Sequence, residues 1–261
     1  MPTFSDQTVL VTGAAAGIGL GVARAFYDEG ARVAIGDFRA DALEQARTHF
    51  PDSSRFHAQE LDVRDQQSVA TFVQNSEAVL GPVTVMVANA GIYPNTPVTE
   101  MDPEEWDRVM ETNARGTFLT CQAAARSMIK HGNGGKIITT ASGAAFSGRR
   151  GAAHYCASKA AIVMLTKVLA LELAEHKINV NVVSPGLIEV HSEVSPISDE
   201  YATILTNSIP LGRIGQPQDI AGGVMFLASP AADFITGTVL SVDGGSSAGR
   251  AFLPASNPTT T

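Results

Sequence analysis

The chain has very few cysteines, and their placement excludes several kinds of site. Only two occur in its 261 residues, Cys121 and Cys156, and they lie far apart without the spacing of metal ligands. Free thiols in a reducing compartment are therefore expected, with neither a disulfide framework nor a metal site. Cys156 adjoins Tyr155, but neighbouring residues on a helix point about 100° apart. We therefore interpret Cys156 as a packing residue rather than a catalytic thiol.

Basic clusters and long apolar runs are also missing. A formal net charge of −8 argues against non-specific nucleic-acid binding, and no group of basic residues would attach the chain to a membrane surface. The longest apolar helical run, Ala160 to Ala174, contains Lys167 and Glu172 and is not expected to span a membrane. Met1 to Asp6 lacks both regions of a signal peptide. A soluble, cytoplasmic protein is expected.

No internal repeat and no linker rich in proline, glycine or serine divides the chain. Apolar residues make up 44% of it and charged residues 17%, which is typical of a globular protein. We therefore expect one domain over residues 1–250, followed by a polar tail at 251–261 that frays. Residues 187–209 mix helix-permissive stretches with proline and are interpreted as a substrate-binding lid.

Short β-rich runs alternate with helical patterns along nearly the whole chain. The expected strands are Val9–Val11, Val33–Ile35, Val83–Ala88, Ile137–Ile138, Val180–Val183 and Val239–Val242, with Arg55–Leu61 as a weaker candidate. The expected helices are Gly17–Gly30, Ala40–Phe50, Gln66–Leu80, Pro103–His131, His154–Glu175 and Pro217–Ala228. This alternation predicts an α/β fold with a parallel sheet that helices cover on both faces.

A glycine-rich turn, residues 13–19, follows the first expected strand and opens a helix. Glycine lets the backbone approach a pyrophosphate closely, and the helix N-terminus offers unpaired N–H groups. The spacing is Gly-x-x-x-Gly-x-Gly rather than the commoner dinucleotide fingerprint. Such a turn can also be a simple tight reversal, but its place in the first βα connection favours nucleotide binding.

Asp37 ends the second expected strand, about 20 residues beyond the glycines, where an acid can bond the adenosine ribose. Its carboxylate would repel the 2′-phosphate of NADP, and no basic residue lies in the glycine turn to offset this. Arg39 is close enough to stack on adenine, although a solvated side chain is the simpler interpretation. NAD is therefore predicted over NADP.

Tyr155 and Lys159 share one face of an expected helix because they are spaced i, i+4. A nearby positive charge lowers the pKa of a tyrosine from its usual value near 10, which suits a general acid or base. The spacing alone is weak evidence, since many amphipathic helices contain it by chance.

Together these features resemble the short-chain dehydrogenase/reductase family, from about Phe4 to Ser246. The matching motifs, in chain order, are Thr12–Gly19, Asp62-Val63, Asn89-Ala90-Gly91, the four residues Asn113, Ser142, Tyr155 and Lys159, then Pro185-Gly186 and Asp243-Gly244-Gly245. The resemblance implies a single doubly wound Rossmann-type domain with a seven-stranded parallel sheet. Cofactor contacts are then expected at Gly13, Ala15, Gly17, Ile18, Gly19, Asp37, Asp62, Val63, Asn89, Ala90, Gly91, Tyr155, Lys159, Pro185, Gly186 and Ile188.

The resemblance also implies catalytic roles. Tyr155 exchanges a proton with the substrate oxygen while hydride passes to or from the nicotinamide. Lys159 lowers the tyrosine pKa and holds the nicotinamide ribose. Ser142 bonds the same substrate oxygen, and Asn113 positions a water that links Lys159 to solvent. Taken singly, Ser142 could merely cap a turn and Asn113 could cap or kink its helix.

The chain departs from the family pattern at two positions. Ala88 stands where the family often has a first asparagine, while Asn89 still supplies the matching amide. Val190 stands where the family usually has threonine, so one hydrogen bond at the nicotinamide end is expected to be missing. Ser192 is a candidate replacement for that hydroxyl.

The expected pocket wall between Ser142 and Tyr155 consists mostly of small residues, which leaves room for a substrate bulkier than a short alcohol. Arg149 and Arg150 are interpreted as a solvated pair, with contact to an anionic substrate group as the minor alternative. His154 and His191 are interpreted as packing or surface residues.

The helix after His154 is apolar nearly all round and so needs a partner on its second face. The family pairs this helix and the preceding one across a twofold axis, so a homotetramer is predicted, with a dimer as fallback.

The sequence thus predicts an NAD-dependent dehydrogenase that interconverts a secondary alcohol, with a polyol or sugar as candidate, and its carbonyl compound. One alternative is a 3-oxoacyl carrier-protein reductase, which usually uses NADP and a basic docking surface. Asp37 and the acidic balance weigh against it. The other alternative is a non-catalytic nucleotide-sensing protein on the same scaffold.

Overall fold

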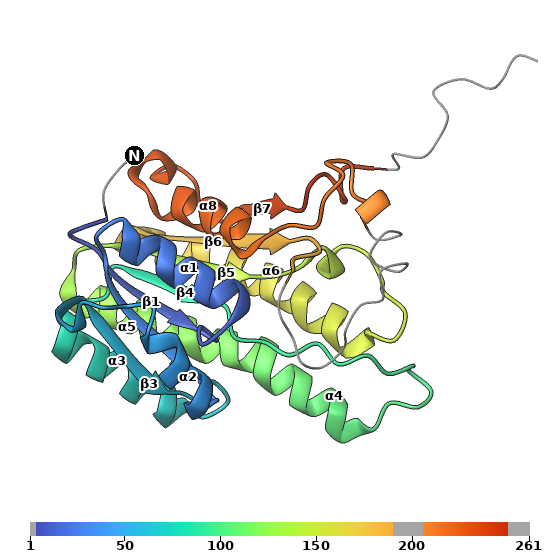
Figure 1. Cartoon of the computed structure of the whole chain (residues 1–261), viewed down its shortest axis with the longest axis horizontal. Coiled ribbons are helices and arrows are strands. Elements are labelled where there is room, and N and C mark those ends of the chain that lie inside the picture. The colour runs from blue at the N-terminus through green and yellow to red at the C-terminus, as the bar shows by residue number, and fades with distance from the viewer. Residues whose placement is uncertain (1–3, 190–205, 250–261) are drawn as a thin grey trace, which may run out of the picture.

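The strands form one parallel sheet, as the alternation predicts. The computed structural model describes residues 4–189 and 206–249. Its strands are β1 (Thr8–Thr12), β2 (Arg32–Asp37), β3 (Phe56–Glu60), β4 (Val85–Ala88), β5 (Gly135–Thr140), β6 (Ile178–Pro185) and β7 (Val239–Val242). All neighbouring strands are parallel, in the order β3-β2-β1-β4-β5-β6-β7 (Figure 1). The predicted seven-stranded doubly wound fold is confirmed, and the weaker candidate strand is β3.

The strand order reverses between β1 and β4, which are neighbours at the centre of the sheet. Every residue of these two strands is buried, which explains their short and mostly apolar sequences. In doubly wound sheets, ligands bind outside the carboxyl ends of the strands at such a reversal. The loops that follow β1 and β4 meet at this point, and one of them is the glycine turn.

Helices cover both faces of the sheet. They are α1 (Gly17–Asp28), α2 (Ala40–Arg47), α3 (Gln66–Leu80), α4 (Pro103–Val109), α5 (Gly116–His131), α6 (Ala153–Leu173) and α8 (Pro217–Ala228), with short turns η1 (Ser53–Arg55), η3 (Gly143–Ala145), η4 (Ala174–His176) and η5 (Pro230–Ala232). α1, α2 and α8 pack around Phe26 and Val224 on one face, and α3, α5 and α6 pack around Phe72 and Met86 on the other. Figure 1 shows α1 and α8 side by side.

The stretch expected as one helix, Pro103–His131, is interrupted. A π-helical segment, η2 (Met110–Arg115), separates α4 from α5, although Figure 1 shows the helix running on through it. The predicted helical stretch is therefore helical throughout, but its helix type changes at these residues. Asn113 lies inside the π segment and is fully buried. Its side chain binds the main chain of Ile92, and this tertiary contact accompanies the local change of helix type.

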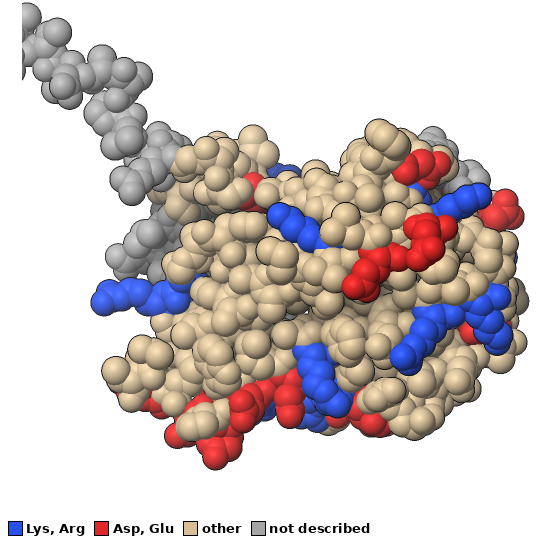
Figure 2. Space-filling view, turned by 180° about the vertical axis from the view of Figure 1, so that it is seen from behind, with Lys and Arg blue, Asp and Glu red and all other residues tan. Residues whose placement is uncertain are grey.

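Several sequence expectations fall outside the described residues. The tail at 251–261 and most of the expected lid at 187–209 lie there, and so do Val190, His191 and Ser192. Within the part of the chain that the structure describes, no helix combines the length and the hydropathy needed to cross a membrane. On the face shown in Figure 2, lysine and arginine side chains are scattered among acidic ones rather than gathered into a patch.

Candidate active site

The glycine turn fits a bound pyrophosphate. A Cβ on Gly19 would lie 2.2 Å from the main-chain oxygen of Gly13, so only glycine allows the helix to start this close to the turn. Gly13 has φ +64° and packs against Ala90, where a Cβ would lie 2.6 Å from the neighbouring Cα. The N-cap residue of α1, Ala16, makes no side-chain capping bond, and no acidic residue occupies the first turn. The helix end therefore keeps its positive character toward an anion.

Asp37 ends β2 beside this turn. Its Oδ2 accepts a hydrogen bond from the Ala15 amide at 3.1 Å, and its Oδ1 accepts one from the Arg39 amide at 3.1 Å. The Arg39 guanidinium also pairs with Oδ1 at 3.4 Å, so Arg39 is not simply solvated as expected, although over half of its side chain is exposed. The carboxylate is thus fixed at the rim of the turn, where a ribose hydroxyl can reach it.

Asn89 holds the glycine turn against β4. Its Nδ2 donates to the main-chain oxygens of Thr12 and Gly13 at 3.1 and 3.0 Å. In return, the Thr12 hydroxyl accepts bonds from the amides of Asn89 and Ala90 at 3.1 and 3.2 Å. The Asn-Ala-Gly motif therefore shapes the glycine turn through the protein's own groups. Ala88, the departure from the family pattern, is a buried residue of β4.

The remaining expected cofactor residues lie around the same edge. The Asp62 carboxylate pairs with Arg64 at 2.7 Å, and this hydrogen-bonded partner lowers the pKa of Asp62. Val63 is buried against Gly116. At the other side, Pro185 ends β6, and Gly186 and Ile188 continue from it. A Cβ on Gly186 would lie 2.7 Å from the Asp243 Cα, and Ile188 pairs with Gly215.

Asn113 and Lys159 converge beside Gly91. From the position of a Cβ on Gly91, Asn113 Oδ1 is 3.1 Å away and Lys159 Nζ is 3.5 Å away. Asn113 Oδ1 accepts from the Ile92 amide at 2.8 Å, while its Nδ2 donates to the Ile92 oxygen at 2.9 Å and to Ser158 Oγ at 3.1 Å. The side chain is thus engaged by protein groups, and its expected role with water stays a prediction.

Lys159 is buried, with only 4% of its surface exposed, and its Nζ donates to the Thr140 oxygen at 2.8 Å. Burial lowers the pKa of Lys159 to about 8. Its Nζ lies 5.6 Å from the centroid of the Tyr155 ring, so the two residues share one face of α6 as the spacing predicts.

The expected lowering of the Tyr155 pKa is wrong for this structure. Burial raises the pKa of Tyr155, and the hydrogen bond with Ser142 and the positive charge of Arg149 offset this only in part. The sequence argument considered the neighbouring charge and left out desolvation, which disfavours the phenolate. Lys159, the neighbouring charge, is itself buried, and this burial disfavours its ammonium form.

Ser142 fits both interpretations that the sequence left open. Its Oγ accepts from the Ala144 amide at 3.2 Å and so caps η3. It also lies close enough to the Tyr155 phenol to lower the pKa of that tyrosine. The structure thus brings Asn113, Ser142, Tyr155 and Lys159 together at the carboxyl ends of the central strands.

Three residues near Tyr155 were missed or undervalued. The Tyr93 ring lies 6.3 Å from the Tyr155 ring in an edge-on arrangement. The Arg149 guanidinium lies 5.4 Å from the Tyr155 ring centroid, and Arg150 has no such contact among those found in the described residues. His154 is fully buried. Tyr93 lies far from Tyr155 along the chain, and the loop that carries Arg149 has no regular spacing relative to α6, so no sequence pattern indicates these contacts.

Known proteins resemble this chain over nearly its whole length. A family profile described as enoyl-(acyl carrier protein) reductase matches residues 13–247. A sorbitol dehydrogenase from Cereibacter sphaeroides is 38% identical and covers 93% of this chain and 98% of its own. A galactitol 2-dehydrogenase from Agrobacterium fabrum is also 38% identical, with the same coverage of 93% and 98%. A short-chain type dehydrogenase/reductase from Mycobacterium marinum has a crystal structure with a TM-score of 0.85 and 38% identity, covering 94% of this chain and 96% of that one.

The chain belongs to the short-chain dehydrogenase/reductase family. It is an oxidoreductase that acts on CH–OH groups and interconverts an alcohol and a carbonyl compound. Dehydrogenases of this family use a nicotinamide cofactor, and the glycine turn, the uncapped start of α1 and the Asp37 carboxylate fit one.

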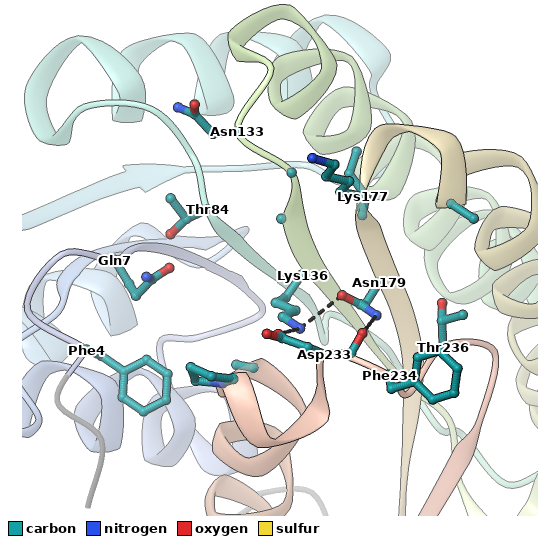
Figure 3. Close-up of a pocket in the computed structure, with 16 residues that line it drawn as sticks. Phe4, Gln7, Thr84, Asn133, Lys136, Lys177, Asn179, Asp233, Phe234 and Thr236 are labelled. Carbon is teal, nitrogen blue, oxygen red and sulfur yellow. Dashed lines mark hydrogen bonds and ion pairs between the residues drawn. The ribbon is translucent and has the colours of Figure 1, made fainter.

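A large cavity lies away from this site in the short-chain dehydrogenase. It has a volume of about 970 Å³ and opens at the amino ends of the strands, between Thr84, Lys136 and Thr236 (Figure 3). On its wall, Lys136 Nζ binds Asp233 at 2.7 Å and Asn179 at 2.9 Å (Figure 3). These polar groups satisfy one another, so the size of the cavity does not mark a reactive centre.

Proposed function

We propose that this enzyme is an NAD-dependent dehydrogenase that oxidises a secondary alcohol of a polyol or sugar, and reduces the carbonyl product in reverse. One observation carries the proposal. Tyr155 shares a helix face with buried Lys159 and lies close enough to Ser142 for that hydroxyl to lower its pKa, at the carboxyl ends of the strands where the glycine turn lies. The names of the sorbitol and galactitol dehydrogenases support a polyol substrate.

In the proposed reaction Tyr155 takes the hydroxyl proton of the alcohol, and Ser142 donates a hydrogen bond to the same oxygen as charge develops there. Lys159, held by the Thr140 oxygen, supplies positive charge beside the phenol. Asn113 fixes the Ile92 segment next to that ammonium group. A bound nicotinamide cofactor would supply the hydride acceptor or donor.

NAD is the proposed cofactor because the Asp37 carboxylate is fixed at the rim of the glycine turn. The turn itself, Asn89-Ala90-Gly91, Asp62-Val63 and Pro185-Gly186 would hold the rest of the cofactor. Arg39 partly neutralises Asp37, so the preference is expected to be about tenfold or more rather than absolute. Steady-state kinetics with both cofactors test this, and equal kcat/KM values would rule the preference out.

The 3-oxoacyl carrier-protein reductase remains the alternative function, and a relative of that name from Chlamydia muridarum, 36% identical to this chain, supports it. That activity would need a basic surface for an acidic carrier protein, whereas the chain has a net charge of −8. A purely nucleotide-sensing protein is disfavoured by the grouping of Ser142, Tyr155 and Lys159. An NADH-formation screen over polyols, aldoses, hydroxy acids and cyclic alcohols, beside a 3-oxoacyl substrate with NADPH, separates these functions.

We also propose a cytoplasmic homotetramer, with residues 1–250 as the catalytic domain. Met164 and Leu171 on α6 are 60% and 82% exposed, and Phe118 on the adjacent α5 is 40% exposed. These apolar side chains would be covered by a second copy. The mass in solution at micromolar concentration tests the assembly, and a monomer would contradict it.

A further inference from the structure

His154 is a fully buried histidine at the second residue of α6, directly before Tyr155. Its Nδ1 lies 2.8 Å from the main-chain nitrogen of Tyr155. Its Nε2 lies 2.9 Å from Glu105 Oε1 on α4. Both ring nitrogens are therefore engaged, each by a different helix.

The hydrogen bonds define which nitrogen carries the proton. The Tyr155 amide can only donate, so Nδ1 must be the acceptor and holds no proton. In the neutral imidazole the proton is then on Nε2, which donates it to the Glu105 carboxylate. Only this tautomer satisfies both bonds.

The bond to Tyr155 replaces a missing helix cap. Amides in the first turn of a helix have no intrahelical partner, and the N-cap residue of α6, Ala152, makes no side-chain cap bond. The His154 ring supplies the acceptor instead, for the amide of the residue that carries the reactive phenol. The start of α6 is thus fixed by a side chain from within its own first turn.

Glu105 connects this turn to two further segments. Hydrogen bonds from Thr96 and from His154 lower the pKa of the Glu105 carboxyl, which favours the anion that the imidazole needs as acceptor. The Thr96 amide donates to the Gly151 oxygen at 2.8 Å, in the loop before α6. Glu105 itself lies on α4, which leads into the π segment that carries Asn113. One carboxylate therefore ties together the segments that surround Tyr155.

We propose that His154 is a positioning residue that holds the first turn of α6, and with it the Tyr155 phenol, in register with Ser142 and Lys159. The proposal rests on the proposed function, in which Tyr155 transfers the proton. Displacing a reacting group by about 1 Å can cost up to about a hundredfold in rate. Loss of the hydrogen bond from the Tyr155 amide to His154 is therefore expected to lower kcat more than it affects cofactor binding.

Two variants separate the two bonds. His154→Gln places an amide near the position of Nε2 and keeps the link to Glu105, but removes the acceptor for the Tyr155 amide. His154→Asn places a carbonyl oxygen near the position of Nδ1 and keeps that acceptor, but loses Glu105. The Glu105 side chain is 23% exposed and can be solvated when its partner is gone.

We expect His154→Gln to lower kcat about tenfold, with the Kd for NADH unchanged within about twofold. His154→Asn is expected to lose at most about threefold. Hydrogen exchange of the peptide that covers residues 153–159 is the second measurement, because it needs no substrate. Exchange at the start of α6 should be about tenfold faster in His154→Gln than in His154→Asn.

Unchanged kcat in His154→Gln would overturn the proposal. So would an equal loss of kcat in both variants together with weaker NADH binding and a lower Tm, since that pattern indicates packing alone. If the unaltered enzyme oxidised no alcohol in the screen, the proposed function would fail. The exchange comparison would still decide whether His154 holds this turn, and equal exchange in the two variants would refute it.

Discussion

The glycine turn, which we call the cofactor turn, and the group of Asn113, Ser142, Tyr155 and Lys159, which we call the reaction centre, are held in place by different kinds of contact. At the turn, backbone groups and small residues dominate. A Cβ at Gly13 or Gly19 would clash with neighbouring backbone, and the Asn89 side-chain amide binds the Gly13 oxygen. At the centre, Tyr155 depends on side chains from distant segments, including Glu105 through His154. Backbone constraints appear in the sequence as glycines at fixed spacing. Networks of side chains do not, because their partners are far apart along the chain.

The two regions also differ in how they treat charge. The start of α1 offers main-chain N–H groups at the crevice and keeps Asp37 at its rim. Lys159 is instead buried and Tyr155 is half-buried, and desolvation shifts both pKa values toward the neutral forms. Burial thus opposes the phenolate form of Tyr155, and the Ser142 hydroxyl and the Arg149 charge offset only part of this effect.

The largest expected effect is at the reaction centre. Tyr155→Phe removes the proton acceptor and should lower kcat by roughly 10³-fold while NADH binding changes by no more than about threefold. Turnover by NADH formation and NADH binding by fluorescence titration measure the two quantities. A variant that kept a tenth of the activity would show that another group transfers the proton.

The cost of burying the Lys159 charge predicts a trade between stability and activity. The gap between the ordinary pKa of 10.5 and about 8 corresponds to about 3 kcal/mol at neutral pH. The unfolded chain binds more protons between these values, so this cost is complete below pH 8 and disappears as pH rises toward 10.5. Lys159→Met should therefore abolish turnover yet raise the free energy of unfolding by about 2 kcal/mol at pH 7, after loss of the bond to Thr140.

Urea denaturation of this variant at pH 7 and pH 9.5, at matched protein concentration, measures the gain. It should shrink at the higher pH. Lys167→Met is the matched control, because Lys167 lies on the same helix and is exposed. A gain that was equal at both pH values, or that appeared in the control as well, would contradict burial as its cause.

The cofactor turn is tested by adding one methyl group. Gly19→Ala places a Cβ 2.2 Å from the Gly13 oxygen, and relieving that clash should weaken NADH binding about 30-fold. Gly222→Ala is the control, since its Cβ on α8 meets nothing within 4 Å. Calorimetric titration of both variants gives the comparison. Equal affinities would mean that the close approach is not needed for the cofactor.

The smallest effect is expected from Arg149. Its charge lowers the pKa of Tyr155 and so offsets part of the rise that burial causes. Arg149→Gln should raise the pKa of Tyr155, and alcohol oxidation needs the phenolate. The acid limb of the kcat/KM profile should therefore move to higher pH, by about half a unit. Arg150→Gln, in the same loop, should leave the profile in place. Superimposable profiles for the two variants would remove Arg149 from the centre.

The same pair of variants decides the open question of an anionic substrate group. A rise in KM for hydroxy acids but not for neutral polyols, confined to Arg149→Gln, would support contact with a carboxylate. Equal KM values across both substrate classes would dismiss that contact.

The fold could be predicted from the sequence because the local pattern of each segment agrees with the element it forms in the folded chain. Buried strands such as β1 and β4 are short apolar runs, and the helices between them carry ordinary start signals such as Pro103 and Pro217. Sequence reasoning reached the candidate residues through spacing and order. It missed the π segment at Asn113 and the bond between His154 and Glu105, because both depend on contacts between segments that only folding brings together.

The sequence by itself determined the parallel α/β sheet, the glycine turn beside Asp37, and the set of Asn113, Ser142, Tyr155 and Lys159. The sheet and the turn follow from local periodicity and from backbone geometry that only certain residues permit, and the four residues follow from the resemblance to the family. The tertiary structure alone decided the pKa shifts of Tyr155 and Lys159. Desolvation depends on every atom that surrounds a group, and that environment exists only once the chain has folded.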